Sequence, residues 1–261
     1  MLVLLSPAKT FNEKLAVPPG KFTIRTPYFY DQAQVLVEQL KTFTPTELAK
    51  LLDVSEKIAD TNYARYHSWQ AELTTQNSKP AAFSFWGDVN KHFDAFTLSR
   101  DDLNYADNHV LYLSGLYGVL RPLDFMQEYR LEMGKSLATS PSCRNLYQFW
   151  QERLVSYLNQ RIKDEKIPVI VNLASKEYFG AVDAAKLKVP VIEIQFKDQK
   201  NGVHKVISVI AKRSRGTFAR WIVQNRVTTV ADLQKFDVDG YYFKPEESTE
   251  TLYTFYRDEK K

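Results

Sequence analysis

The chain has 261 residues, of which 44% are hydrophobic and 25% are charged, and its net charge is +4. This composition is typical of a globular protein in water, and the apolar runs are too short to cross a bilayer, which argues against an integral membrane protein. A single cysteine, Cys143, excludes an internal disulfide framework. The first residues lack the basic region and the length of a secretory signal, so we expect a cytoplasmic protein.

The N-terminal segment predicts a strand that leads into polar residues. The apolar run from Leu2 has the character of a short buried strand, and Ser6 and Lys9 follow where that strand ends. Ligands gather at strand ends in α/β proteins, which makes both residues candidates for a site. A helix is predicted from Tyr28 to Thr42, because apolar side chains recur there on one helical face.

Residues 44–68 predict a pair of short helices. Thr44 and Glu47 have the spacing of a capping box, and Ser55 begins a second helix after a tight turn. The pair loosely matches the helix-hairpin-helix layout that grips nucleic-acid backbones. Such turns usually carry glycines whose amides face a phosphate, and the acidic Asp53 stands there instead. The segment is either an αα-hairpin packed on the core or a DNA-contacting element.

Strand and helix patterns then alternate along the chain. In order they predict a strand at Ala82–Trp86, a helix from Ser99 to Asn108, a strand at Val110–Leu113, a helix from Asn145 to Lys163, a strand at Pro168–Leu173, a helix from Ser175 to Tyr178, and strands at Val191–Phe196 and Val203–Ala211. We therefore expect an α/β fold of the mixed α+β kind. It has a mixed sheet flanked by helices, with the helical pair inserted after the first strand, in one domain spanning residues 1–261.

Positive charge is concentrated in one stretch. Between Asp198 and Asp232 there is no acidic residue, while the following basic residues fall there: Lys200, Lys205, Lys212, Arg213, Arg215, Arg220 and Arg226. Such a run is either a solvated face or a site for a polyanion.

Within that stretch, residues 212–216 predict a basic loop that leads into a helix over residues 217–225. Lys212, Arg213 and Arg215 would then lie beside free amides at a helix N-terminus, which is a phosphate-binding arrangement. The alternative is that Arg213 and Arg215 form structural ion pairs with Glu132 or Glu177.

The segment from Leu113 to Gly134 has the pattern of neither a helix nor a strand. Three glycines and two arginines, Arg121 and Arg130, are set among aromatic residues at irregular intervals. Glycines give the backbone freedom and arginines supply fixed charge with forked donors, so we interpret the segment as the wall of a binding site or as a core loop.

Catalytic chemistry is open on the sequence. Glu132 is a candidate general base, while Ser175 and Lys9 are candidates for nucleophilic chemistry if the fold brings a base near them. The chain contains neither a Walker loop nor a dinucleotide fingerprint, so we expect no nucleotide cofactor. Its histidines are far apart in sequence, and we expect no metal site.

Several long strings occur together in the chain: SPAKT near the N-terminus, LSGLYGVLRPLD followed by YRLEMG, NLASKEY, and AKRSRGTFARWIVQNR. In this order they resemble the YaaA family of peroxide-stress-resistance proteins, and the resemblance runs from Met1 to about Tyr242. It implies a cytoplasmic protein that limits peroxide damage by restraining free iron, with a helix-hairpin-helix element and DNA-binding behaviour.

The resemblance favours DNA contact by the helical pair, with Lys57, Asn62 and Arg65 as contacts. It also implies that five basic residues converge on one cationic cleft: Lys9, Arg121, Arg130, Arg213 and Arg215. Two hypotheses follow. The first is a DNA-binding protein that grips the backbone without strong sequence preference. The second is an enzyme that acts on a nucleotide or another small phosphorylated or base-like ligand in the same cleft.

Overall fold

A computed structural model describes residues 1–13, 15–18 and 22–259. Its main sheet has eight strands within these residues, in the order β4-β3-β1-β6-β7-β10-β9, with β8 paired to β7. The strands are β1 (Leu2–Leu5), β3 (Val110–Ser114), β4 (Gly118–Leu120), β6 (Ile170–Asn172), β7 (Val191–Lys200), β8 (Val203–Lys205), β9 (Tyr241–Phe243) and β10 (Leu252–Arg257). A separate ribbon pairs β2 (Lys79–Pro80) with β5 (Phe125–Met126).

The centre of the sheet is parallel. β1 pairs in parallel with β3 on one side and with β6 on the other, and β6 continues in parallel to β7 and β10. β4, β8 and β9 run antiparallel at the margins. Because the central strands are buried, their side chains are almost continuously apolar, as the runs at residues 2–5 and 169–171 show. The expected α/β class with a mixed sheet is confirmed.

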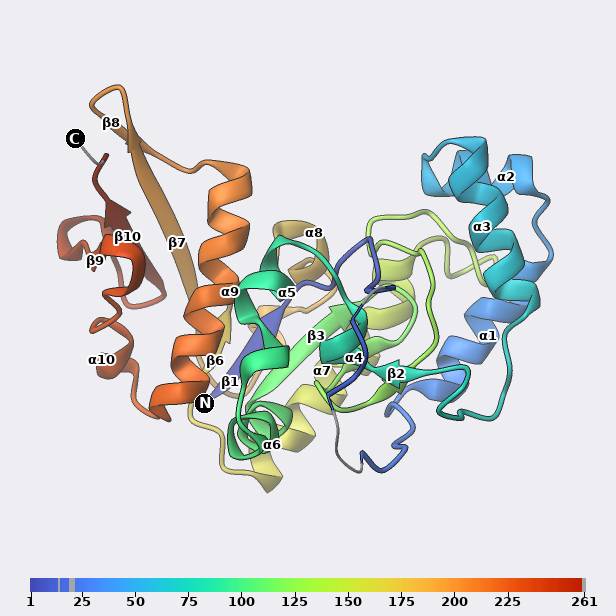
Figure 1. Ribbon diagram of the computed structural model, residues 1–261, viewed down its shortest axis with the longest axis horizontal. Coiled ribbons are helices and arrows are strands. Elements are labelled where there is room, and N and C mark those ends of the chain that lie inside the picture. The colour runs from blue at the N-terminus through green and yellow to red at the C-terminus, as the bar shows by residue number, and fades with distance from the viewer. Residues whose placement is uncertain (14, 19–21, 260–261) are drawn as a thin grey trace.

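The helices are α1 (Tyr30–Lys41), α2 (Pro45–Leu52), α3 (Glu56–His67), α4 (Ala81–Ser84), α5 (Asp88–Phe93), α6 (Arg100–His109), α7 (Leu146–Asp164), α8 (Lys176–Phe179), α9 (Ser208–Asn225) and α10 (Val230–Leu233). Short 3-10 turns lie at Ala95–Thr97, Ala184–Lys186, Val238–Gly240 and Pro245–Glu247. In Figure 1, α1, α2 and α3 form a group at one end of the molecule, and β7 to β10 lie at the other end.

The helical pair forms as its sequence predicts. The Thr44 hydroxyl accepts from the Glu47 amide at 3.3 Å, and the Glu47 carboxylate accepts from the Thr44 amide at 2.8 Å. This reciprocal cap starts α2. Asp53 ends α2 in the left-handed conformation at φ 53°, and Ser55 precedes α3.

Two stretches differ from their predicted structure. Residues 82–86 do not form the expected strand: Ala81–Ser84 is a helical turn, and Phe85 makes a single bridge to Phe11. The expected strand over 203–211 ends at Lys205, and α9 begins at Ser208. β-branched residues favour a strand locally, but here the packing of Phe218 into the aromatic core with Phe196 favours the helix.

The expected basic loop at residues 212–216 is also wrong, because this segment lies inside α9. Gly216 in this segment is needed for helix packing. A Cβ on Gly216 would come 2.1 Å from the Val89 carbonyl oxygen, so the lack of a side chain lets α9 lie against α5. Figure 1 shows these two helices side by side. The amides near Arg213 and Arg215 therefore belong to a helix interior, and the expected phosphate site at a helix N-terminus does not form.

Candidate functional site

The strand order of the sheet has a topological switch point between β1 and β6. The chain passes from β1 to β3 on one side, and then returns to add β6, β7 and β10 on the other side. In open α/β sheets, the crevice beyond the carboxyl ends of two such strands is the usual ligand site. Ser6 follows β1 and Ser175 follows β6, and the Ser6 hydroxyl accepts from the Ser175 amide at 2.8 Å. Two sequence candidates are thus joined at this point.

A cavity of about 370 Å³ opens here, and we call it the switch-point cavity. Four segments line it: residues 6–10 after β1, residues 87–90 at the start of α5, residues of the α8 region, and one face of α9. Lys212 and Arg215 are one helical turn apart on α9, so both side chains reach the same cavity. Lys9 and Ser175 line it too.

Arg215 is a partly buried cation in the switch-point cavity. Among the described residues no carboxylate lies within ion-pair distance of its guanidinium. Burial lowers the pKa of Arg215, and the charge of Glu193 opposes that shift. The alternative, a structural ion pair of Arg215 with Glu132 or Glu177, is not found among the described residues. A cation that is partly desolvated and has no ion-pair partner attracts anionic ligands.

Glu132 lies beside this cavity with two cations on one of its oxygens. Its Oε1 accepts from Arg130 Nε at 2.9 Å and lies 3.3 Å from Lys9 Nζ. The residue is 2% exposed, and its Oε2 is buried without a hydrogen-bond partner in the described structure. A void of about 10 Å³ adjoins Glu132 and Tyr178 and matches the volume of one water molecule.

A second hollow of about 310 Å³, the α3 groove, shares Lys9 and Thr10 with the lining of the cavity. Its walls include Asn62 and Arg65 of α3 and Arg130. The Arg65 guanidinium forms an ion pair with Glu128 and lies 5.3 Å from the centre of the Phe11 ring. The two hollows bring together Lys9, Arg130 and Arg215 with Lys212 and Arg65.

Asn62 has a local role in the helix. Its side-chain amide donates to the Ile58 carbonyl at 2.8 Å, and the residue is 1% exposed. Its Oδ1 is buried without a partner in the described structure. Lys57 is exposed on α3 and lines neither hollow. Of the three predicted contacts on the helical pair, Arg65 is the charged residue that lines the groove, and its guanidinium is paired with Glu128.

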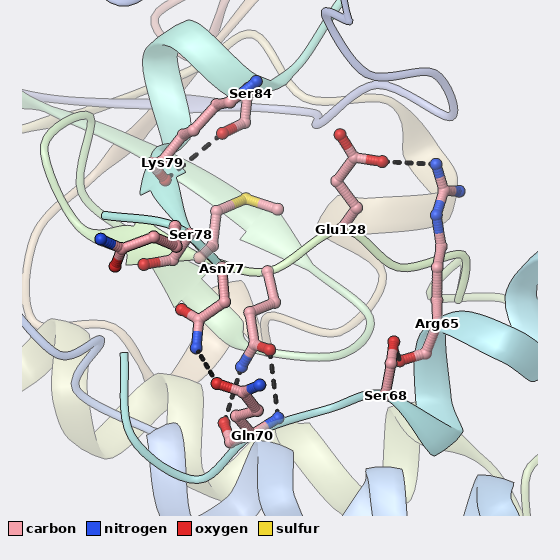
Figure 2. A pocket seen from close by; sticks show the side chains of 11 residues that line it. Arg65, Ser68, Gln70, Asn77, Ser78, Lys79, Ser84 and Glu128 are labelled. Carbon is pink, nitrogen blue, oxygen red and sulfur yellow. Dashed lines mark hydrogen bonds and ion pairs between the residues drawn. The ribbon is translucent and has the colours of Figure 1, made fainter. Parts of the chain in front are cut away.

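A third pocket, of about 450 Å³, lies on the other side of Arg65 and is shown in Figure 2. Its amides largely bond to one another: Asn77 Nδ2 donates to Gln70 Oε1 at 2.7 Å, and Gln127 Nε2 donates to the Gln70 carbonyl at 2.8 Å. Figure 2 shows the Asn77 and Gln70 side chains turned toward each other, with the Arg65–Glu128 pair on the other side of the pocket. The polar groups of this pocket connect α3 to the β2–β5 ribbon.

Arg121 does not join the other basic residues. It follows β4, which runs antiparallel to β3, so it lies at the amino end of the parallel strands. Its guanidinium forms an ion pair with Asp107 at 2.8 Å and donates to the Asn108 side chain at 2.6 Å. The expectation that Arg121 converges with Arg130 is therefore wrong, because the β3–β4 hairpin places the two residues at opposite ends of the parallel strands.

Arg213 does not line the switch-point cavity, although it contacts Asp88, which does. It is exposed, and its Nε lies 3.5 Å from Asp88. The segment from Leu113 to Gly134 is consequently divided. Its first half is buried core, and Arg130 and Glu132 in its second half face the small void.

Sequence reasoning missed Asn90 and Tyr178 as cavity residues. Asn90 lies one turn into α5, and its position in the cavity depends on the packing of α5 against α9. No local spacing signals that contact between segments more than a hundred residues apart. Tyr178 is the last residue of the NLASKEY string, and the prediction of Ser175 as a candidate in that string is the one signal near Tyr178.

Within residues 1–13, 15–18 and 22–259, no three His, Cys, Asp or Glu side chains gather as a metal-binding group. Over the same ranges, no helix has the length and apolar character that crossing a membrane demands.

The fold and the switch-point cavity define an α/β protein with a mixed sheet and a polar cavity at the carboxyl ends of β1 and β6. Comparison with known proteins places it further. Residues 1–247 match the family model described as peroxide stress protein YaaA, and the chain belongs to this family. The resemblance drawn from the sequence strings is thereby confirmed.

Relatives align over nearly the whole chain. A UPF0246 protein of Aliivibrio fischeri is 45% identical over 260 residues, covering 100% of this chain and 99% of the relative. A UPF0246 protein of Paracidovorax citrulli is 47% identical over 257 residues, covering 98% of each. One from Shewanella amazonensis is 45% identical over 260 residues, covering 100% of each. The family is named for peroxide stress.

Proposed function

We propose that this protein acts in the cytoplasm in peroxide resistance by binding DNA through its cationic hollows, and thereby helps to limit iron-dependent oxidative damage. The observation that carries the proposal is the line of cations along two hollows that meet at Lys9. Lys212 and Arg215 lie at one end, Arg130 lies near Lys9, and Arg65 lies at the other end. Three carboxylates, Glu13, Asp88 and Glu177, line the same hollows, so the cations outnumber the anions by five to three. A row of cations of this length suits a phosphate backbone rather than a single small anion.

The helical pair borders this groove. α3 supplies Arg65 and, through Thr61 and Asn62, part of the groove wall. The turn between α2 and α3 carries Asp53, whose charge opposes a phosphate at that turn. We therefore place the DNA contact along the α3 side that faces Lys9, and not at the hairpin turn.

Such contacts are made to phosphates, so we expect weak sequence preference. Fluorescence anisotropy with a labelled duplex, repeated over a series of NaCl concentrations, tests this. If four to six phosphates are neutralised, log K falls against log salt with a slope of about −4 to −5, since each contact contributes about 0.9. A slope near zero, or no binding at low salt, would overturn the proposal.

A second candidate function is an enzyme acting on a nucleotide or another small phosphorylated or base-like ligand in the same hollows. Glu132 favours it, because only its Oε1 is needed to hold Lys9 and Arg130, while its Oε2 is buried without a hydrogen-bond partner in the described structure and a water-sized void adjoins the residue. Glu132→Gln keeps the shape and removes the base. We expect an enzyme to lose about 100-fold or more of its turnover.

The two candidates separate in one comparison. Cells that lack the protein are complemented with the parent or with Glu132→Gln, and survival in hydrogen peroxide is scored beside DNA affinity of the purified proteins. Retained DNA affinity with lost survival supports the enzyme. Equal survival removes Glu132 from the mechanism and leaves DNA binding as the function.

A further inference from the structure

Lys9 borders each of the spaces that surround Glu132. It belongs to the lining of the switch-point cavity, of the α3 groove and of the small void beside Glu132. Its side chain is 59% exposed, so the amine is open to a molecule that occupies either hollow. A DNA strand that runs along the proposed path therefore passes over the Lys9 amine.

A buried carboxylate lies next to that amine. Glu132 Oε1 is 3.3 Å from Lys9 Nζ, and the hydrogen bond that it accepts from Arg130 at 2.9 Å holds this oxygen in place. A carboxylate so close to an ammonium group can take its proton. Lys212, the other lysine of the switch-point cavity, has no carboxylate within ion-pair distance in the described structure. Of the two lysines, Lys9 is thus the one with a base beside it.

We propose that Lys9 forms an imine with an aldehyde in damaged DNA, namely the ring-opened deoxyribose that remains where a base has been lost. The lysine amine is the side-chain group that forms Schiff bases with carbonyl compounds. The inference rests on the proposed DNA binding and adds a chemical class of substrate to it. This substrate is a lesion within the strand, whereas the second candidate function concerns a small free ligand.

The reaction needs no further reactant. Glu132 takes a proton from the Lys9 ammonium, and the neutral amine adds to C1′ of the aldehyde, which forms the N–C bond. The nitrogen then passes one proton to the former carbonyl oxygen. Glu132 returns its proton to the same oxygen, which leaves as water while the C=N bond forms. An ammonium and an aldehyde thereby become a protonated imine and one water, and Glu132 is again a carboxylate. The void that Lys9 and Glu132 both line has room for one water molecule.

Borohydride trapping tests the inference, because sodium borohydride reduces an imine to a stable amine. The full chain is incubated with a labelled duplex that carries one abasic site, or with the same duplex without that site, and is then reduced and run on a denaturing gel. We expect a covalent protein–DNA adduct with the abasic duplex alone, and tryptic mass spectrometry should locate the sugar on Lys9. No adduct, or an adduct on other amines and not on Lys9, would overturn the inference.

Two substitutions separate the nucleophile from the base. Lys9→Arg keeps the positive charge but supplies a guanidinium, which forms no imine, so we expect the adduct yield to fall at least about tenfold. Glu132→Gln keeps the shape and removes the proton acceptor, so the initial rate of trapping should fall about 100-fold. Lys188→Met lies outside both hollows near the amino end of β7, and as the control it should leave the yield unchanged. A parental yield from Lys9→Arg would contradict Lys9 as the nucleophile.

Duplex affinity distinguishes this inference from the DNA proposal, and anisotropy measures it on the same samples. Lys9→Arg changes a mostly exposed side chain and retains its charge, so we expect the parent's melting temperature and an affinity within about twofold of the parent's. If the parent binds the abasic duplex and no adduct is trapped, the inference fails while DNA binding stands. If the parent binds neither duplex at low salt, the DNA proposal fails and the inference fails with it.

Discussion

Lys9 Nζ lies 3.3 Å from Oε1 of Glu132, an oxygen that already accepts from Arg130. The two partners differ in environment: the Lys9 side chain is 59% exposed and the Glu132 side chain 3% exposed. Lys9 is thus held at the junction of the two hollows by a buried anion, while its own charge still faces solvent. This geometry gives the two residues different roles in stability and in binding.

Removing Glu132 should cost much more stability than removing Lys9. Glu132→Ala leaves the Arg130 guanidinium, whose side chain is 16% exposed, without its buried partner, and we expect the free energy of unfolding to fall by about 3 kcal/mol. Lys9→Ala removes an exposed partner and costs less than about 1 kcal/mol. Urea denaturation of both variants measures the difference. Equal losses would show that Lys9 is structural.

Arg121 should matter for stability and not for DNA. It bonds the buried Asp107, which Arg25 also contacts at 2.6 Å, at the edge of the sheet far from Lys9. Arg121→Ala removes hydrogen bonds from a buried carboxylate, so the free energy of unfolding should fall by about 1–3 kcal/mol. Duplex affinity, measured below the melting temperature, should equal that of the parent. A large loss of affinity in the folded variant would return Arg121 to the DNA surface.

Gly216 should tolerate no side chain. A Cβ would meet the Val89 carbonyl oxygen at 2.1 Å and the Phe93 amide nitrogen at 2.9 Å, both backbone atoms of α5. Gly216→Ala therefore forces α5 and α9 apart and lowers the free energy of unfolding by about 1–3 kcal/mol, despite the higher helix propensity of alanine. Thermal denaturation checks this, with Ser208→Ala at the start of α9 as a control. A stabilised Gly216→Ala protein would contradict the close packing.

His109 predicts a loss of stability on mild acidification. Burial lowers the pKa of His109, while its hydrogen bond to the Met1 carbonyl at 3.0 Å opposes the shift. The unfolded chain then takes up a proton near pH 6.5 that the folded protein accepts only at lower pH. The free energy of unfolding should thus fall as the pH drops from 7 to 6, and His109→Gln should reduce that slope. An unchanged slope in the variant would exclude His109 as its source.

The parts of the site that the sequence predicted are those set by local rules. The buried runs at Leu2–Leu5 and Ile170–Asn172 have strand character in their residues alone, so Ser6 and Ser175 could be placed at strand ends. The capping box of Thr44 likewise fixes the start of α2 within a few residues. Parallel pairing of β1 with β6 then brings the two serines together.

The parts that failed depend on contacts between distant segments. Gly216 and the charges around it have the local character of a loop, and only the approach of α5 explains a glycine inside α9. Arg121 looks like Arg130 in sequence, and the β3–β4 hairpin separates them. The sequence around Asn90 carries no signal of its burial, because that burial comes from the packing of α5 against α9.

DNA binding along the hollows that meet at Lys9 is tested most directly by comparing two double variants of equal charge. Lys9→Ala with Arg215→Ala removes two cations from the hollows, whereas Lys186→Ala with Lys188→Ala removes two exposed lysines near the amino end of β7. Salt-series anisotropy on one labelled duplex should show the first slope reduced by about 2 units from the parent, and the second unchanged. Equal slopes in the two double variants would contradict the proposed location of DNA.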